Sequence, residues 1–188
     1  MSPPASVGDG ERLRLFVALR LPDPTVAEIV RWQESALPAG EGMRRVPPEN
    51  LHITLAFLGS RPADERDRIH EAVWTSAAAA GPITLGVRRY HETQRVGMLV
   101  LDDEAPTRQS SVLAQDVQRR LAALGVYRPE SRPWKPHVTV LRFRRRPRLA
   151  PELPALGPVS PSEVALYHSV LRRDGARYEV LESADLGG

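Results

Sequence analysis

Apolar residues along the chain follow two periods, one typical of strands and one typical of helices. Residues 12–21, RLRLFVALRL, form the first strand-like run. In residues 22–37 the apolar positions recur every three or four residues, which predicts an amphipathic helix with Asp23 as its N-cap and Pro24 in its first turn. The chain therefore opens with a strand followed by a helix.

The rest of the chain continues to mix the two kinds of element. A strand is expected in ENLHITLAFLG, 49–59, stopped by Gly59, and helices are expected at about 62–80 and at 113–124, the second closed by Gly125. Further strands are expected at 82–87, 97–102 and 137–143, and a closing hairpin turned at Asp174 and Gly175 is expected from 163–171 and 176–182. Because the strands alternate more than they form continuous apolar runs, antiparallel sheets covered by helices are favoured, and the fold class is α+β.

The strand within 49–59 is expected to have one mixed and one apolar face. Alternate residues of a strand share a face, which groups on the mixed face His52, Thr54 and Ala56. The opposite face groups Leu51, Ile53, Leu55 and Phe57. The strand at 137–143 repeats the arrangement, with His137 and Thr139 on one face.

The His-x-Thr spacing is rare by chance. Seven threonines and five histidines in 188 residues predict about 0.2 such triplets, whereas the chain holds three. The third, His91-Glu92-Thr93, lies in a segment that is polar on both faces, so we expect a loop without a direct role there. For His70 and His168 we expect ordinary, partly buried side chains.

Two histidines that face one cleft suit acid–base chemistry. The imidazole gives or takes a proton near neutral pH, so one ring can act as base and the other as acid. Threonine hydroxyls beside them can bind the non-bridging oxygens of a phosphodiester. Neither motif contains a carboxylate, and the spacing differs from the helical His pair of zinc hydrolases, so no metal and no cofactor are expected.

Composition adds limits and one open question. The chain has no cysteine, which excludes disulfides, thiolate metal sites and cysteine nucleophiles. The N-terminal stretch resembles no signal peptide and no window suits a membrane span, so a cytoplasmic protein without a membrane partner is expected. The arginines at 142, 144, 145, 146 and 148 suit an RNA backbone or form a solvated face. Both interpretations stay open.

The flanks of the two motifs carry a family resemblance. HITLAFLG and RPWKPHVTVLRF, together with RLRLFVALRLP and YHSVLRRDGARYEVL, resemble the 2H phosphoesterase superfamily, and within it the LigT-like bacterial RNA 2′,3′-cyclic phosphodiesterases, or 2′-5′ RNA ligases. The resemblance implies a bilobal α+β fold over 12–185, with two pseudo-symmetric lobes, each carrying an antiparallel sheet, around a central cleft. Residues 1–11 are expected to be flexible, and the protein is expected to be a monomer.

The resemblance also implies roles. His52 would be the proton donor and His137 the proton acceptor, with Thr54, Thr139 and Arg142 at the phosphate. The implied reaction is hydrolysis of RNA 2′,3′-cyclic phosphate ends to 2′-phosphomonoesters, with reverse 2′-5′ ligation without ATP. The alternatives are a related enzyme acting on a nucleotide cyclic phosphate or a 2′-5′ oligonucleotide, and a non-catalytic RNA-binding module. Strict alternation puts Arg142 on the face opposite His137, so its role requires a bulge or the strand end.

Overall fold

A computed structural model describes residues 11–40, 42–172 and 175–187. Its strands are β1 (Arg12–Arg20), β2 (Met43–Arg45), β3 (His52–Pro62), β4 (Leu85–Glu92), β5 (Val96–Asp103), β6 (His137–Phe143), β7 (Glu163–Arg172) and β8 (Gly175–Asp185). Its α-helices are α1 (Asp23–Ala36), α2 (Arg66–Ala78) and α3 (Gln109–Ala123), and short 3-10 helices cover Pro48–Asn50 and Ala63–Glu65. The order mixes strands and helices, as the sequence predicts.

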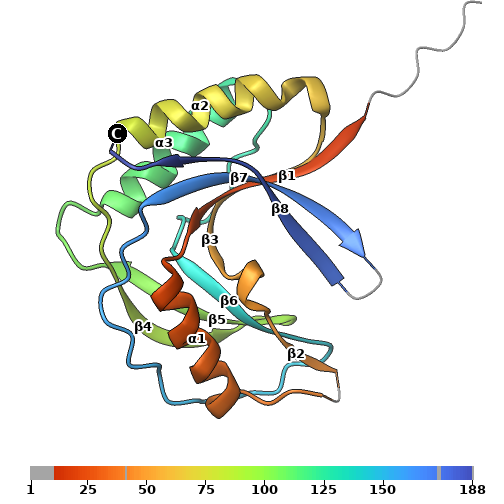
Figure 1. The fold of residues 1–188 in the computed structure, drawn as a ribbon, viewed down its shortest axis with the longest axis vertical. Helices are drawn as coiled ribbons and strands as arrows, with labels where there is room; N and C mark the ends of the chain where they lie inside the picture. The colour runs from red at the N-terminus through yellow and green to blue at the C-terminus, as the bar shows by residue number, and fades with distance from the viewer. Residues whose placement is uncertain (1–10, 41, 173–174, 188) are drawn as a thin grey trace, which may run out of the picture.

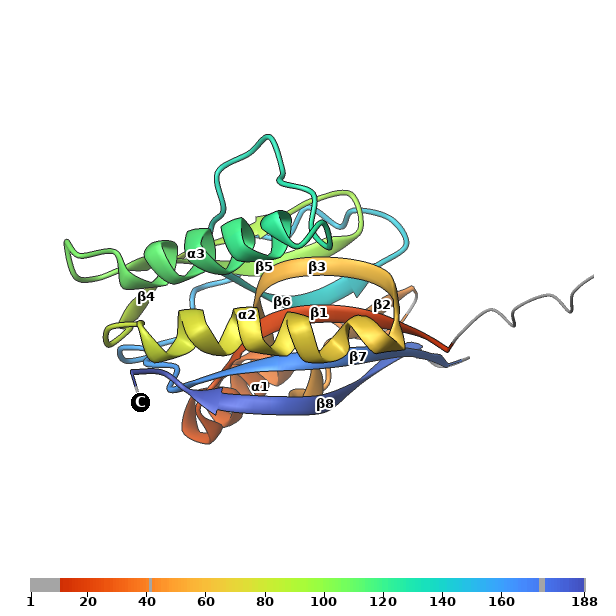
Figure 2. The ribbon, with the colours of Figure 1, turned by 90° about the horizontal axis from the view of Figure 1, so that it is seen from above.

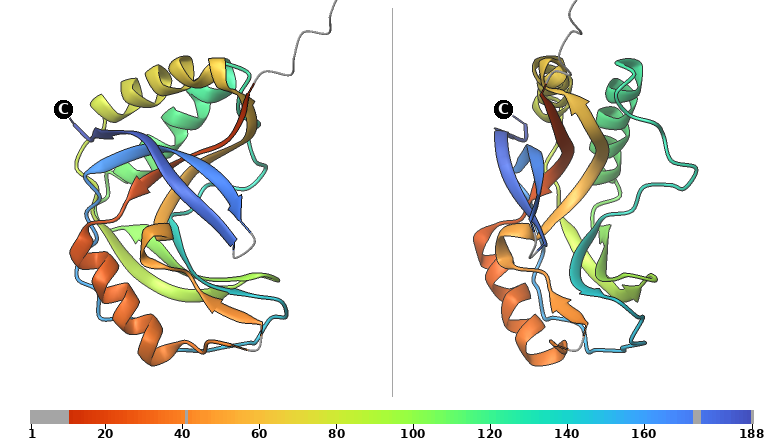
Figure 3. Two further views of the ribbon diagram at one scale, coloured as in Figure 1. Left: turned by 45° about the vertical axis from the view of Figure 1, so that its right-hand side comes forward. Right: turned by 90° about the vertical axis from the view of Figure 1, so that its right-hand side faces the viewer.

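Within the described residues all strands belong to one antiparallel sheet in the order β4-β5-β6-β3-β1-β7-β8, with β2 paired to β6. We call β3, β1, β7 and β8 the first half-sheet, and β4, β5, β6 and β2 the second half-sheet. The sheet curls strongly, so that the first half-sheet lies above the second in Figure 1 and in the left view of Figure 3. At the junction between them, β3 pairs with β6 through Ile53 and Val138.

Helices cover the outer side of both half-sheets. Helices α2 and α3 pack side by side, with α2 against β7 and β8 and α3 against β3 (Figure 2). Helix α1 lies against the second half-sheet (Figure 1), where buried Gln33 bonds to β6. The helices bury apolar stripes at helical spacing, formed in α2 and α3 by Ile69, Val73, Ala77, Leu113, Val117 and Leu121.

The chain passes repeatedly between the two half-sheets. Strand β1 belongs to the first, β2 to the second, β3 to the first, β4 to β6 to the second, and β7 and β8 to the first. Neither half-sheet is therefore a contiguous stretch of sequence. The single domain over 12–185 stays a prediction that this interleaving supports, and the predicted flexible start falls almost wholly on 1–10, outside the described residues.

The boundaries of two elements correct the sequence expectations. Asp23 is not the N-cap of α1, because Pro22 takes that position and Asp23 lies in the first turn without a side-chain capping bond. Strand β3 does not stop at Gly59 but continues to Pro62. Gly59 has a φ of +69° beside a register shift against β1, so its conformational freedom accommodates a bulge within the strand.

The expected loop at 91–93 is wrong for its first two residues, while Thr93 lies just after the strand. His91 and Glu92 belong to β4, where they pair with Met98 and Gly97 of β5. The polar residues of this segment suggested a loop, but the side chain of Glu92 is buried and has hydrogen-bond partners inside the fold. The Glu92 carboxylate accepts backbone N–H bonds from Arg148 at 2.9 Å and from Leu149 at 2.8 Å.

The predicted hairpin is present as β7 and β8, which pair from Glu163–Asp185 to Arg172–Gly175. Of its two predicted turn residues, Asp174 lies outside the described residues and Gly175 is the first residue of β8. Gly125, with a φ of +72°, follows α3 as predicted for a residue that ends a helix.

Candidate active site

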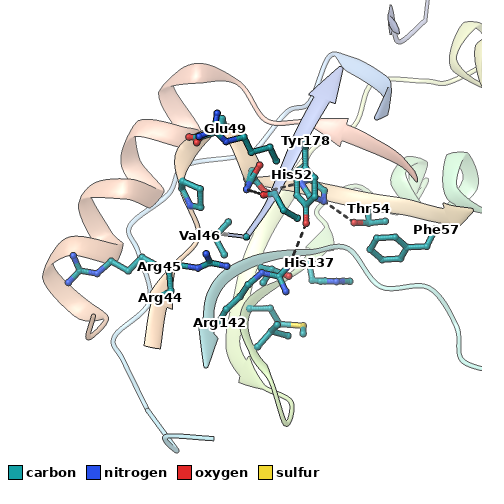
Figure 4. A pocket seen from close by; sticks show the side chains of 18 residues that line it. Arg44, Arg45, Val46, Glu49, His52, Thr54, Phe57, His137, Arg142 and Tyr178 are labelled. Atoms are coloured by element: carbon teal, nitrogen blue, oxygen red, sulfur yellow. Dashed lines mark hydrogen bonds between the residues drawn. The ribbon is translucent and has the colours of Figure 1, made fainter. Parts of the chain in front are cut away.

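The two His-x-Thr motifs meet at the junction of the half-sheets. Ile53 pairs with Val138, and each of these residues directly follows one of the histidines. Extending this antiparallel register by one residue places His52 opposite Thr139 and Thr54 opposite His137. All four motif residues line one cleft of about 450 Å³ between the half-sheets (Figure 4). The structure therefore brings together side chains that are 85 residues apart in the sequence.

Both histidine rings are held in the same way. The Nδ1 atom of His52 lies 2.9 Å from the carbonyl oxygen of Asn50, and that of His137 lies 3.0 Å from the carbonyl oxygen of Lys135. A carbonyl oxygen can only accept, so each Nδ1 carries the proton and each neutral ring has a free Nε2 lone pair. At His52 that Nε2 accepts from the Thr54 hydroxyl at 3.1 Å (Figure 4).

Each motif is followed by a bulge one residue after its threonine. In β3, Thr54 and Ala56 pair with consecutive residues of β1, which leaves Leu55 extra. In β6, Thr139 and Leu141 pair with consecutive residues of β5, which leaves Val140 extra. An extra residue shifts the alternation of the residues that follow by one position.

The bulges decide which side chain reaches the cleft five residues after each histidine. Arg142 lines the cleft with His137, so the bulge that its predicted position required is present. Phe57 lines the same cleft and is 64% exposed, which overturns its expected place on the apolar back of β3. Ala56, expected beside His52 on the mixed face, is instead buried in the core. Phe57 and Arg142 thus occupy equivalent positions in the two motifs.

Two glutamine side chains donate hydrogen bonds to the carbonyl groups of the bulge residues. The side-chain amide of Gln118, on α3, donates to the carbonyl oxygen of Leu55 at 2.8 Å. The amide of Gln33, on α1, donates to the carbonyl oxygen of Val140 at 2.7 Å, and that oxygen also accepts from the backbone N–H of Val46 at 3.0 Å. Each covering helix therefore holds the bulge of the half-sheet beneath it, a pairing that no local sequence pattern indicated.

His52 sits among aromatic rings that the sequence did not single out. Its ring centroid lies 5.0 Å from that of Phe16, 5.8 Å from Tyr167 and 5.4 Å from Tyr178. These rings come from β1, β7 and β8, on the inner face of the first half-sheet. The signal in the sequence was the unbroken apolar run at 15–19, which alternation alone does not explain and which indicates a strand buried on both faces.

Burial among these rings lowers the pKa of His52 from 6.5 to about 4. The hydrogen bond to Asn50 acts in the opposite direction, and electrostatic repulsion from the nearby His137 and Arg142 side chains lowers the pKa of His52 further. Arg142 itself reaches the Tyr178 hydroxyl at a long 3.5 Å (Figure 4). His52 is therefore neutral in the free protein near pH 7.

The other candidates lie away from the cleft. His70 contacts Glu182 at 2.7 Å and His168 lies 3.9 Å from Glu179, and neither lines the cleft. Of the clustered arginines only Arg142 lines it, while Arg146 pairs with the buried Glu92 at 3.3 Å. Among residues 11–40, 42–172 and 175–187, no three His, Cys, Asp or Glu side chains gather as a metal site, and no helix is long and apolar enough to cross a membrane.

Similar proteins carry the same fold over nearly the whole chain. The chain is 34% identical over 184 residues to the RNA 2′,3′-cyclic phosphodiesterase of Thermus thermophilus, covering 94% of this chain and 91% of that protein. The crystal structure of E. coli LigT complexed with NADP⁺ has a TM-score of 0.75 and 27% identity, covering 95% of this chain and 100% of the other. The crystal structure of TT0787 of Thermus thermophilus has a TM-score of 0.78 and 28% identity, covering 94% and 99%. These likenesses confirm the predicted α+β fold of the LigT type.

The family model for the 2′-5′ RNA ligase superfamily matches residues 21–176. This range contains both His-x-Thr motifs and the strands that carry them, together with α1 and β7. With the match spanning most of the chain, and the two motifs facing one cleft at the junction of a curled sheet, the protein belongs to the 2′-5′ RNA ligase superfamily.

Proposed function

We propose that this protein hydrolyses RNA 2′,3′-cyclic phosphate ends to 2′-phosphomonoesters. The observation that carries the proposal is the pair of His-x-Thr motifs on one cleft, with both imidazoles held in the same tautomer. The name of the Thermus thermophilus relative supports the same activity. The cyclic phosphate would lie between the two histidines, since an acid and a base on opposite sides of phosphorus suit in-line displacement.

In the proposed mechanism, His137 accepts a proton from the attacking water and His52 donates a proton to the leaving oxygen. The free Nε2 of His137 accepts a proton from water, which attacks phosphorus. His52 donates a proton to the departing 3′ oxygen, so that neither oxygen carries a full negative charge in the transition state. Thr54 and Thr139 bind the non-bridging oxygens, and the Arg142 guanidinium stabilises the charge that develops on them.

The burial of His52 sets a condition for its role as donor. Its lowered pKa leaves the ring neutral in the free protein, and a neutral ring with its proton on Nδ1 has none to give at Nε2. A bound phosphate places a negative charge beside the ring and favours the protonated form. The substrate would therefore help to charge its own proton donor, while in its absence the cleft holds little positive charge at this position.

The same groups can catalyse the reverse type of reaction. If a 5′-hydroxyl replaces water, the same proton transfers join two RNA ends by a 2′-5′ linkage without ATP. A mononucleotide cyclic phosphate or a 2′-5′ oligonucleotide remains an alternative substrate, because the motif residues contact only the phosphate. A non-catalytic RNA-binding module is the alternative from another class. A metal-free reaction, a cytoplasmic location and a monomeric state stay predictions.

Product analysis with purified protein tests the proposal. A 2′,3′-cyclic mononucleotide and a short RNA ending in a 2′,3′-cyclic phosphate are incubated separately in EDTA, and the products are resolved as 2′- or 3′-phosphates. We expect 2′-phosphate from both substrates. Absence of hydrolysis, or a 3′-phosphate product, would contradict the proposed reaction, and binding of RNA without turnover would support the binding module.

A further inference from the structure

A second pocket of about 320 Å³ adjoins the cleft. The two share the side chains of Thr54, Phe57, Met98 and His137, but His52 lines only the first. The second pocket therefore opens on the His137 side of the site. The proposed hydrolysis needs only a water molecule beside His137, so it does not account for a pocket of this size.

The third His-x-Thr triplet lines this pocket. His91 of β4 pairs with Met98 of β5, and Met98 pairs with Thr139 of β6. Residues paired across strands present their side chains on the same face, so His91 belongs to the same face of the second half-sheet as the second motif. His91 and Thr93 both line the pocket. The third triplet, which has no part in the proposed hydrolysis, therefore lies beside the candidate active site.

The charges around the second pocket are mostly positive. Arg89, Arg132 and Lys135 line it, and their side chains form no ion pair or hydrogen bond with the described part of the chain. Glu130 is the acidic residue among those that line it. Three cations that the described residues leave unpaired favour a ligand that carries phosphate.

The walls of the pocket offer apolar and aromatic surface for a nucleoside. Met98 and Val100 line it from β5, and Tyr127 and Trp134 line it from the segment before β6. The indole N–H of Trp134 donates to the carbonyl oxygen of Thr54 at 2.9 Å, which fixes this ring beside the first motif. Aromatic side chains held in this way stack on nucleobases with little loss of conformational freedom.

We propose that the second pocket binds the first nucleoside of an RNA strand with a free 5′-hydroxyl, the acceptor in 2′-5′ ligation. The inference rests on the proposed function, in which the attacking oxygen lies at His137. The base of the acceptor occupies the aromatic and apolar surface, its 5′-hydroxyl reaches His137, and the phosphate that follows its 3′ oxygen meets the cations Arg89 and Arg132.

The reaction at this subsite balances without a further reactant. The acceptor 5′ oxygen forms a bond to phosphorus as the bond from phosphorus to the donor 3′ oxygen breaks. The 5′ proton passes to His137, and the proton held by His52 passes to the 3′ oxygen. In the opposite direction, the pocket holds the 5′-hydroxyl strand released when a 2′-5′ linkage is cleaved.

Binding of a dinucleotide with a free 5′-hydroxyl tests the subsite without requiring turnover. The indole N–H signal of Trp134, assigned with Trp134→Phe, is followed by NMR as the dinucleotide is added. We expect a saturable shift and a dissociation constant at least five-fold weaker in Arg89→Ala and in Arg132→Ala. Arg88→Ala is the matched control, because Arg88 neighbours Arg89 in β4 but does not line the pocket. No shift at Trp134, or equal affinity in Arg88→Ala, Arg89→Ala and Arg132→Ala, would overturn the proposal.

A ligation assay tests the catalytic consequence. With a 2′,3′-cyclic mononucleotide as donor and the same dinucleotide as acceptor, the ratio of 2′-5′-linked trinucleotide to hydrolysed donor should fall at least five-fold in Arg89→Ala and stay within two-fold in Arg88→Ala. An unchanged ratio in Arg89→Ala would refute the acceptor role. Failure of the proposed function gives a different result, namely no hydrolysis of the donor by the wild type while the Trp134 titration is unaffected.

Discussion

Ile53 and Val138 are paired across the junction of β3 and β6, and each is the residue that follows a cleft histidine. Both are buried, with 0% and 1% of their surface exposed. The local two-fold relation between the motifs runs through this pair, because the antiparallel register places His52 opposite Thr139 and Thr54 opposite His137. Small movements of the two half-sheets at this point would change the separation of the histidines.

The bulge glutamines provide the first prediction. Gln118→Leu removes the side-chain donor to the Leu55 carbonyl oxygen. Gln33→Leu removes the side-chain donor to the carbonyl oxygens of Val140 and Val46, although Val140 still accepts from the backbone N–H of Val46. We expect each to lower the free energy of unfolding by about 1 to 3 kcal/mol, measured by urea denaturation. Because the bulges place Phe57 and Arg142, kcat should also fall under conditions in which both variants are fully folded. Full activity in both variants would show that the bulges are held without the glutamines.

The two histidines provide the second prediction. His52→Ala and His137→Ala should each lower kcat for a cyclic mononucleotide by about 10²- to 10⁴-fold. The double variant should be little worse than either single one, because the two groups act in one step. His91→Ala serves as the control, since His91 lines the adjoining pocket and not the cleft, and should hydrolyse the mononucleotide like the wild type. Near-normal turnover in either motif variant would rule out the two-histidine mechanism.

The absence of carboxylates from the cleft motifs provides the third prediction. The described residues gather no set of three metal-binding side chains. Exhaustive chelation should therefore leave the rate of hydrolysis unchanged, and elemental analysis of the purified protein should find no stoichiometric metal. Loss of activity that one particular metal ion restores would show that the prediction is wrong.

The lowered pKa of His52 provides the fourth prediction. The unfolded chain takes up a proton on His52 near pH 6.5, whereas the folded protein resists it until about pH 4. The stabilisation is thus complete above pH 6.5 and is lost as the pH falls toward 4, by about 2 to 3 kcal/mol. Urea denaturation at pH 7.5 and 4.5 should show this loss in the wild type and a smaller one in His52→Gln.

The pKa of His52 can also be measured with and without a bound ligand. An NMR titration of the His52 ring should report a pKa near 4 in the free protein and a higher value when a nucleoside 2′-monophosphate is bound, because the phosphate charge favours the protonated ring. An equal pKa with and without the nucleotide would remove the proposed means of charging the donor.

The parts of the site that depend on alternation within one strand could be predicted from the sequence, whereas the parts that depend on pairing with other strands could not. The alternation in HITLAFLG and HVTVLRF places each His and Thr on one face, and those two pairs do line one cleft. The bulges at Leu55 and Val140 arise from pairing with other strands. Alternation alone therefore could not predict that the side chains of Phe57 and Arg142 line the cleft. A period of two holds only while the ladder is unbroken.

The environment of His52 could not be predicted for a related reason. Phe16, Tyr167 and Tyr178 come from strands more than 30 residues away on one side and more than 100 on the other, and only the sheet order brings them together. Glu92 shows the converse error. Its charge suggested an exposed loop, but backbone donors from Arg148 and Leu149 satisfy it inside the fold.

The arginines after β6 provide the last prediction, in which salt separates a role at the reacting phosphate from contacts along an RNA backbone. Arg146 is excluded from the test, because its removal would leave the buried Glu92 without its cation. Arg145 and Arg148 are exposed and have no ion-pair partner among the described residues. If they contact RNA, the variant carrying Arg145→Gln and Arg148→Gln should bind long single strands less tightly.

The two kinds of arginine should differ in salt dependence and in substrate length. The double variant should flatten the log–log slope of RNA binding against salt by about 0.7 per lost contact, and should turn over a cyclic mononucleotide as the wild type does, because that substrate has no further backbone. Arg142→Ala should instead lower kcat for short and long substrates alike, since Arg142 lines the cleft with both histidines. Rates at several salt concentrations on both substrates decide between them. Identical profiles would refute the division of roles, and an unaltered slope in the double variant would mean that Arg145 and Arg148 form only a solvated face.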